Sequence, residues 1–186
     1  QLIDPLQGRR DLDIGQIQAV SDASFQHDPV RALRAVRQAT EFNFTIAAKT
    51  QQLLRQAAPG LKNVSPERQR DELVKLLNTP APGQAAQLLR HLDVLPHLLP
   101  EVAALVGVDQ SPPHYLDVFD HTAAVLQAWA AMRQADFAGL SLSGKLRPAV
   151  QQYLRELLVG NVTRQELLPL ALLLHDTGKP LTRTEE

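Results

Sequence analysis

The sequence predicts an all-α protein composed of several helices of moderate length. Apolar residues recur at helical spacing along most of the 186 residues, and no stretch alternates apolar and polar residues as a half-buried strand does. Proline, glycine and polar residues interrupt this pattern repeatedly, which favours many helices over a few long ones. With 44% hydrophobic and 21% charged residues, the composition is that of a globular protein. Aromatic residues make up only 4%, so Leu, Val and Ala must supply most of the core.

Composition also excludes several classes of protein. The chain has no cysteine, which excludes disulfides and thiolate metal sites and suits the reducing cytoplasm. No apolar run reaches the roughly 18 residues of a membrane span, and no signal peptide is visible. We therefore expect a cytoplasmic protein that does not act on a membrane. The opening residues read like sequence from within a domain, so we expect a fragment of a longer chain.

Charge is unevenly distributed, although the net charge is only −1. Residues 28–75 carry nine basic and five acidic side chains, a net charge of +4. Residues 1–27 have a net charge of −2 and residues 76–186 one of −3. A polyanion such as RNA would therefore meet the segment 28–75 first.

A helix with a basic stripe is predicted to begin at Asp28. Asp28 suits the N-cap and Pro29 the first helical position, where a missing N–H costs nothing. Arg31 and Arg34 are three residues apart, with Arg37 one step round, so their guanidinium groups form a stripe. The opposite face is apolar and would pack on a core: Leu33, Val36 and Ala39.

This pattern allows two interpretations. A carboxylate can accept a hydrogen bond from the amino group of cytosine or adenine, and a neighbouring guanidinium can donate to ring acceptors, so Asp28 and Arg31 could together read a nucleobase edge. Alternatively, the segment is simply a capped helix with a solvated basic face, which is the commoner outcome for such spacing.

Further helices follow along the chain. Thr45 is predicted to cap a second helix, which Pro59 and Gly60 stop, and Ser65 with Pro66 opens a third. A sharp turn is predicted at 111–113 and a loop at 136–146. The remaining apolar turns and helices are predicted at about residues 88–92, 95–108, 120–132, 148–159 and 163–175.

Three groups of residues stand in a recognisable order in the first half of the chain. They are Asp4, Pro5, Leu6, Gly8, Asp11 and Leu12; then Asp28, Pro29, Arg31, Arg34, Ala35 and Arg37; then Asn63, Val64, Ser65, Pro66, Glu67, Arg68, Arg70, Asp71, Glu72 and Leu73. In this order and spacing they resemble successive motifs of the bacterial tRNA nucleotidyltransferase (CCA-adding) and poly(A) polymerase family.

Two later groups resemble the HD domain that many members of this family carry. They are Pro112, Pro113, His114, Asp117, Val118, His121 and Thr122; then His175, Asp176, Gly178, Lys179 and Pro180. The resemblance therefore covers the chain except for about residues 130–168.

The resemblance implies a protein with a catalytic head followed by a helical neck, body and tail. The head of the family holds a phosphate loop and carboxylates that bind two Mg²⁺ ions, and neither is present here. The fragment alone should therefore lack transferase activity. The implied division is the end of the head or a connector, the neck with its template helix, the body with RNA-binding helices, and the amino-terminal part of the HD domain: 1–27, 28–60, 61–110 and 111–186.

The resemblance also assigns roles in nucleotide binding. Asp28 and Arg31 would form the protein template that hydrogen-bonds the Watson–Crick edge of incoming CTP or ATP, with Arg34 and Arg37 near the triphosphate or bracing the pair. The other substrate would be the 3′ end of tRNA or another RNA. The residues implied to support the template helix are Glu67, Arg68, Arg70 and Glu72. Among them, Arg68 and Arg70 could bond Asp28 or Glu72 rather than a ligand.

Some positions depart from the family pattern. His27 stands where the family commonly has Glu, which would change the support of Arg31. Gln7 replaces a commoner Gly, and the pair Arg9 and Arg10 is unusual there. The template pair itself is intact.

Two histidines and one carboxylate form a candidate metal site. His121, His175 and Asp176 would suit a divalent metal with water in its open positions, and HD enzymes normally add an Asp from a later helix. Alternatively, the segment is a degenerate HD fold that packs or binds RNA. The other histidines with a predicted place, His91 and His97, should lie at helix surfaces or satisfy local hydrogen bonds. Trp129 and Tyr153 should belong to the core.

Three functions remain open at this point. The favoured one is the neck, body and partial HD region of a tRNA nucleotidyltransferase or poly(A) polymerase that selects CTP or ATP and holds RNA. The second is an HD-type metal-dependent phosphohydrolase whose amino-terminal helices are only structural. The third is a non-catalytic RNA-binding helical module. The first is preferred because the Asp28 motif and the Ser65 helix both match in order, whereas the HD motif fits either of the first two.

Overall fold

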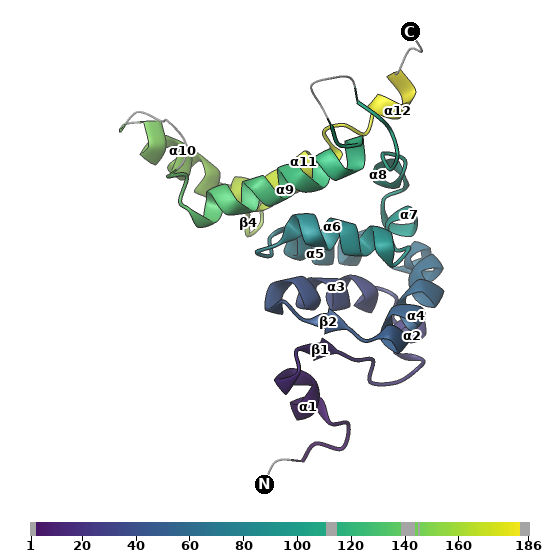
Figure 1. The fold of residues 1–186 in the computed structure, drawn as a ribbon. Coiled ribbons are helices and arrows are strands. Elements are labelled where there is room, and N and C mark those ends of the chain that lie inside the picture. Colours follow the sequence, from purple (N-terminus) through teal and green to yellow (C-terminus); the bar gives the residue numbers. More distant parts are fainter. Residues whose placement is uncertain (1–2, 111–114, 139–143, 145, 183–186) are drawn as a thin grey trace.

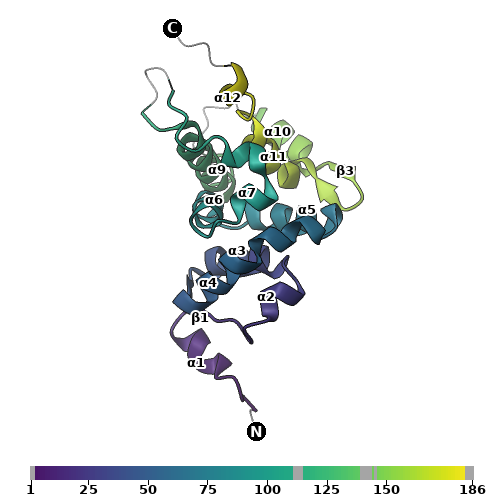
Figure 2. The same ribbon diagram turned by 90° about the vertical axis from the view of Figure 1, so that its right-hand side faces the viewer.

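The fold was analysed in a computed structural model that describes residues 3–110, 115–138, 144 and 146–182. Helices dominate these ranges, which confirms the predicted all-α class. They are stacked in layers, with the amino-terminal end at the bottom of Figure 1 and the long helix α9 (Val118–Gln134) lying across the top. The turned view shows the same stacking, with the two ends of the chain at opposite ends of the stack (Figure 2). The predicted turn at 111–113, His114 and most of the predicted loop 136–146 lie outside the described residues.

The first layer combines short helices with one pair of short strands. Its elements are α1 (Gly8–Asp13), β1 (Gln16–Ile17), α2 (Ser24–His27), α3 (Arg31–Phe42), β2 (Thr45–Ile46) and α4 (Ala48–Ala57). β1 and β2 pair in parallel, with Thr45 N–H donating to the Gly15 carbonyl at 2.9 Å. The prediction that Thr45 caps a helix was therefore wrong. The sequence shows no strand-like alternation at these short strands. Strands of two residues are too short to show an alternating pattern.

Helix α3 is the centre of the core. Leu33 and Val36 are fully buried and Ala39 is 2% exposed, which confirms the apolar face predicted from their spacing. The elements that come next after α4 are the 3₁₀ helix η1 (Ala58–Asn63), α5 (Pro66–Leu77), α6 (Pro82–His91), α7 (Leu95–Leu98) and α8 (Pro100–Ala103). Of these, α3 packs on α5 and α6. The buried face of α3 therefore determines how α5 packs beside α3.

The upper layer is formed by α9 with the elements that follow it. These are α10 (Leu146–Arg155), the antiparallel pair β3 (Leu157–Val159) and β4 (Val162–Thr163), α11 (Arg164–Leu174) and α12 (Lys179–Thr182). α9 packs on α6 below it and on α11 beside it. Arg133 of α9 donates to the carbonyl oxygen of Asn78 at 2.8 Å, and Asn78 in turn donates to the Glu166 carbonyl at 2.9 Å. Asn78, the residue directly after α5, is thus bonded to both α9 and α11.

The two aromatic predictions had different outcomes. Trp129 is 7% exposed and packs near Phe137, as expected of a core residue. Tyr153 is 57% exposed and lies under the guanidinium of Arg164, 4.1 Å from the ring centroid, so its assignment to the core was wrong.

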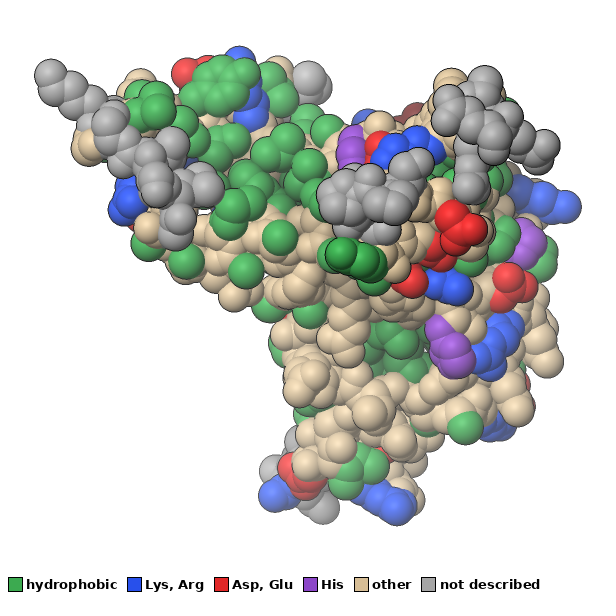
Figure 3. All heavy atoms as spheres, turned by 45° about the horizontal axis from the view of Figure 1, so that its top comes forward, with side chains coloured by type: hydrophobic (Ala, Val, Ile, Leu, Met, Phe, Trp, Pro, Cys, Tyr) green, Lys and Arg blue, Asp and Glu red, His purple; other side chains and the backbone are tan. Residues whose placement is uncertain are grey.

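Figure 3 shows the molecule tilted so that its top comes forward. On this face, hydrophobic side chains gather mainly at the upper left, and most of the charged and histidine side chains lie on the right. Among the described helices, none is both long and apolar enough to cross a membrane.

Candidate nucleotide-selecting site

Asp28 lies in the turn between α2 and α3. The helix itself begins at Arg31, with Val30 in the N-cap position and no side-chain cap. The N–H groups of Arg31 and Ala32 donate to the carbonyls of Asp28 and Pro29, both at 3.0 Å, so residues 28–30 wind into α3 as a tighter, 3₁₀-type turn. The prediction of Asp28 as N-cap and Pro29 as first helical residue was therefore wrong. The prediction failed because the Asp28 carboxylate binds Arg68 and does not accept from a backbone N–H of α3.

The Asp28 carboxylate is held between two arginines. Nη2 of Arg68, on α5, donates to both carboxylate oxygens at 3.0 and 2.9 Å. Nε of Arg31 lies 3.6 Å from Oδ2. Asp28 is 23% exposed, whereas both arginine side chains are half exposed. Since a carboxylate has about four lone-pair sites, Asp28 keeps acceptor capacity for a ligand while Arg68 holds its orientation.

A buried carboxylate binds the other two arginines of the stripe. Glu72, on α5, is 6% exposed and accepts from Nη2 of Arg34 at 3.2 Å and from Nε of Arg37 at 3.3 Å. Burial by itself would raise the pKa of the Glu72 carboxyl, but the hydrogen bonds and charges of Arg34 and Arg37 outweigh it and hold that pKa below its ordinary value. Glu72 is therefore ionised at neutral pH and joins α3 to α5.

The remaining residues of the predicted support lie outside this network. Arg70 donates to Asp71 at 2.8 Å, and Glu67 is exposed in the first turn of α5. Lys75 lies 3.6 Å from Glu72, a contact that the sequence analysis missed although the two residues are three positions apart on one helix. Of the four residues predicted to support the helix, Arg68 therefore binds Asp28, and Glu72 binds Arg34 and Arg37.

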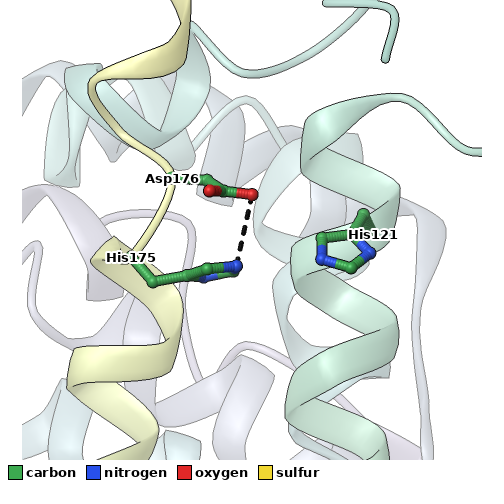
Figure 4. A group of neighbouring side chains, drawn as sticks. All are labelled: His121, His175 and Asp176. Atoms are coloured by element: carbon green, nitrogen blue, oxygen red, sulfur yellow. Dashed lines mark ion pairs between the residues drawn. The ribbon is translucent and has the colours of Figure 1, made fainter. Parts of the chain in front are cut away.

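A second cluster lies in the upper layer. His121 of α9 and His175 at the end of α11 have ring centroids 5.7 Å apart, and Asp176 follows His175 directly. One ligand atom from each of the three side chains lies within 4.8 Å of the others. Figure 4 shows the three side chains meeting between the two helices. The sequence named these three residues, and the fold brings them together across 54 positions.

One ring nitrogen of His175 is held by the backbone. Its Nδ1 lies 2.6 Å from the Leu172 carbonyl oxygen, which leaves Nε2 facing the cluster. Nε2 lies 3.2 Å from Oδ2 of Asp176, which Lys179 also approaches at 2.7 Å. Ligands of one ion lie about 2.0–2.2 Å from it and hence about 3 Å apart. The 3.2 Å between Nε2 of His175 and Oδ2 of Asp176 matches this spacing, and the three ligand atoms all lie within 4.8 Å of one another, so these residues could hold a divalent ion.

Comparison with known proteins places this fold in a family. The family described as "probable RNA and SrmB-binding site of polymerase A" matches residues 43–105. An A-adding tRNA nucleotidyltransferase from Deinococcus radiodurans is 34% identical over 98% of this chain and 37% of its own length. A multifunctional CCA protein from Halorhodospira halophila is 36% identical over 100% of this chain and 39% of its own length.

A solved structure supports the same conclusion. The Thermotoga maritima CCA-adding enzyme complexed with tRNA matches 96% of this chain and 37% of its own, with a TM-score of 0.55 and 25% identity. The chain therefore belongs to the bacterial tRNA nucleotidyltransferase and poly(A) polymerase family, and it spans less than two fifths of the length of these relatives.

Proposed function

We propose that this chain is the nucleotide-selecting and RNA-holding part of an enzyme that adds nucleotides to the 3′ end of tRNA or another RNA. Residues 28–60 would form the neck with the template, 61–110 the body that contacts RNA, and 111–186 the start of an HD domain, with 1–27 connecting to a catalytic head. The names of the relatives support nucleotide addition to tRNA. Nucleotidyl transfer itself would take place in the head, where Mg²⁺ supplies electrostatic stabilisation of the transferred phosphate.

The observation that carries this proposal is the Asp28–Arg31 pair. Cytosine and adenine both present an amino donor beside an unprotonated ring nitrogen on their Watson–Crick edge. A carboxylate that accepts from the amino group and a guanidinium that donates to the ring nitrogen complement both bases. Uracil and guanine present a carbonyl beside an N–H and reverse this pattern, so they would leave both protein groups unpaired.

The surrounding contacts would keep this pair in place. Arg68 holds both oxygens of Asp28, so the carboxylate is oriented before a base arrives. Glu72 binds Arg34 and Arg37 and ties the template helix to α5. Preorganised groups lose less free energy on binding than groups that must first be ordered.

The test is substitution of the pair in the parent enzyme. We expect Asp28→Ala and Arg31→Ala to reduce the preference for CTP and ATP over UTP and GTP by about tenfold or more, because each removes one partner of a base-reading pair. The folded yield should be unchanged, since neither side chain is part of the hydrophobic core. Asp22→Ala is the matched control, because Asp22 is exposed and pairs only with Lys49 among the described residues. An unchanged nucleotide preference in either variant would contradict the proposal.

The histidine cluster supports a second candidate activity, metal-dependent hydrolysis of phosphate esters. His121, His175 and Asp176 would hold the ion, which would activate a water molecule for attack on phosphorus. Lys179, 2.7 Å from Asp176, would place a positive charge beside the substrate phosphate.

Calorimetric titration with Mn²⁺ tests this site. We expect one binding site per chain, lost in His175→Ala and retained in His97→Ala, an exposed histidine far from the cluster in sequence. Equal binding by both variants would exclude the cluster as the metal site. Release of phosphate from a simple phosphomonoester should show the same dependence on His175.

A further inference from the structure

Gly60 makes a close contact with Pro29. A Cβ atom built at Gly60 would lie 2.8 Å from Cγ of Pro29 and 3.5 Å from its Cβ. Ordinary carbon–carbon contact begins at about 3.5 Å, so an alanine would need about 0.7 Å of extra room. Gly60 is not among the glycines with positive φ, so its backbone would accept any residue. Among the described neighbours of Gly60, the ring of Pro29 is the one that a side chain at this position would strike.

Neither side of this contact can easily move. η1, which carries Gly60, is anchored by Ala58 and Leu61, both fully buried. On the other side, Val30 directly follows Pro29 and is 1% exposed. The proline ring is itself stiff, because it is closed onto the backbone. Because Val30 is buried on one side of Pro29, a displacement of Pro29 would therefore move Asp28, the residue on its other side.

Asp28 is sensitive to such a displacement. Its two oxygens lie 3.0 and 2.9 Å from one nitrogen of Arg68, which reaches across from α5. Hydrogen bonds weaken beyond about 3.2 Å, so a shift of several tenths of an ångström would loosen this grip. The contact between Gly60 and Pro29 thus adjoins, by one residue along the chain, the carboxylate that is proposed to read the base.

We propose that Gly60 is a positioning residue for nucleotide selection. Because Gly60 has no side chain, Pro29 can pack directly against η1, and this packing holds the Asp28 carboxylate at hydrogen-bonding distance from Arg68. This inference rests on the proposed function of Asp28. Gly60 touches no base; it acts through Pro29, and it determines where the carboxylate stands relative to the incoming nucleotide.

The test is Gly60→Ala in the parent enzyme, with kcat/KM measured for CTP and UTP on tRNA that lacks its 3′ end. A misplacement of about 1 Å can cost on the order of a hundredfold in rate, so we expect roughly a tenfold loss in the CTP/UTP ratio for this smaller shift. Gly83→Ala is the matched control. A Cβ at Gly83 would lie 2.5 Å from the Ala123 carbonyl between α6 and α9, so this variant should lower the melting temperature and leave the ratio unchanged.

A compensating variant separates positioning from stability. Pro29→Ala removes the ring atom that the new methyl group would strike, so Gly60→Ala with Pro29→Ala should recover most of the CTP/UTP ratio lost in Gly60→Ala. If Gly60→Ala alone folds poorly, recovery of folding and of the wild-type ratio in the double variant gives the same answer.

The outcomes distinguish this inference from the proposed function. An unchanged ratio in Gly60→Ala, or no recovery in the double variant, overturns the role of Gly60 when Asp28→Ala does alter the ratio. An unchanged ratio in Asp28→Ala overturns the proposed function, and the inference with it.

Discussion

Replacement of Glu72 tests how firmly α3 is tied to α5. Glu72→Gln keeps the size of the side chain and removes its charge, while Arg34 and Arg37 remain beside it. Its contacts with these arginines, at 3.2 and 3.3 Å, are long for charge-assisted hydrogen bonds, and Arg34 is half exposed. A hydrogen bond to a charged group contributes about 1.5–3 kcal/mol, and the exposed partner must be discounted for solvent screening. We therefore expect a loss of about 2 kcal/mol in the free energy of unfolding at pH 7.

The assay is urea unfolding of the 186-residue chain as a function of pH. The pKa of Glu72 is lowered in the folded state, so its contribution to stability is fully present above the ordinary value of 4.5 and is lost as the pH falls through the folded pKa. The difference between wild type and Glu72→Gln should therefore shrink as the pH falls below 4.5. Glu41→Gln is the matched control, because Glu41 binds the same Arg37 at 2.8 Å but is 41% exposed.

The control should lose no more than about 0.5 kcal/mol. Equal losses in the two variants at pH 7, or a loss in Glu72→Gln that does not change with pH, would refute the assignment of Glu72 as the buried junction.

Two further predictions concern the core and the upper layer. Leu33→Ala should cost about 2–5 kcal/mol, because Leu33 is fully buried at the centre of α3, and urea unfolding with an unchanged m-value would show it; a cost under about 1 kcal/mol would contradict the central place of α3 in the core. Thr163→Ala should cost about 1 kcal/mol, because Thr163 and Glu166 form a capping box at the start of α11. The backbone N–H and the hydroxyl of Thr163 both donate to Glu166 and lower the pKa of its carboxyl. The variant keeps the N–H and loses the hydroxyl, so an NMR titration should show the pKa of Glu166 raised part of the way toward its ordinary value, and an unmoved pKa would contradict the hydroxyl's share in the capping box.

Local periodicity predicted the helices but not how they begin. The apolar spacing of Leu33, Val36 and Ala39 was sufficient to place the buried face of α3. The cap at Asp28 failed because its carboxylate binds Arg68, 40 residues further along the chain, and no local rule contains that partner. Thr45 failed for a similar reason, since its pairing partner lies in β1.

The candidate sites depended on contacts between distant residues. Arg34 and Glu72 meet across 38 positions, and His121 and His175 across 54. Resemblance to family motifs named these residues, and spacing alone could not have joined them. The contact between Gly60 and Pro29 was invisible in the sequence, because a glycine near a proline is usually read as a turn signal.

The most direct test of the central claim is nucleotide addition by the parent enzyme, head included. The enzyme would be incubated with Mg²⁺ and tRNA that lacks its 3′ end, with each of the four nucleotides supplied separately and then together. We expect incorporation of C, of A, or of C followed by A, and exclusion of U and G. Incorporation of all four nucleotides at similar rates would contradict base reading by Asp28 and Arg31. Hydrolysis of phosphate esters without any incorporation would instead assign the activity to His121, His175 and Asp176.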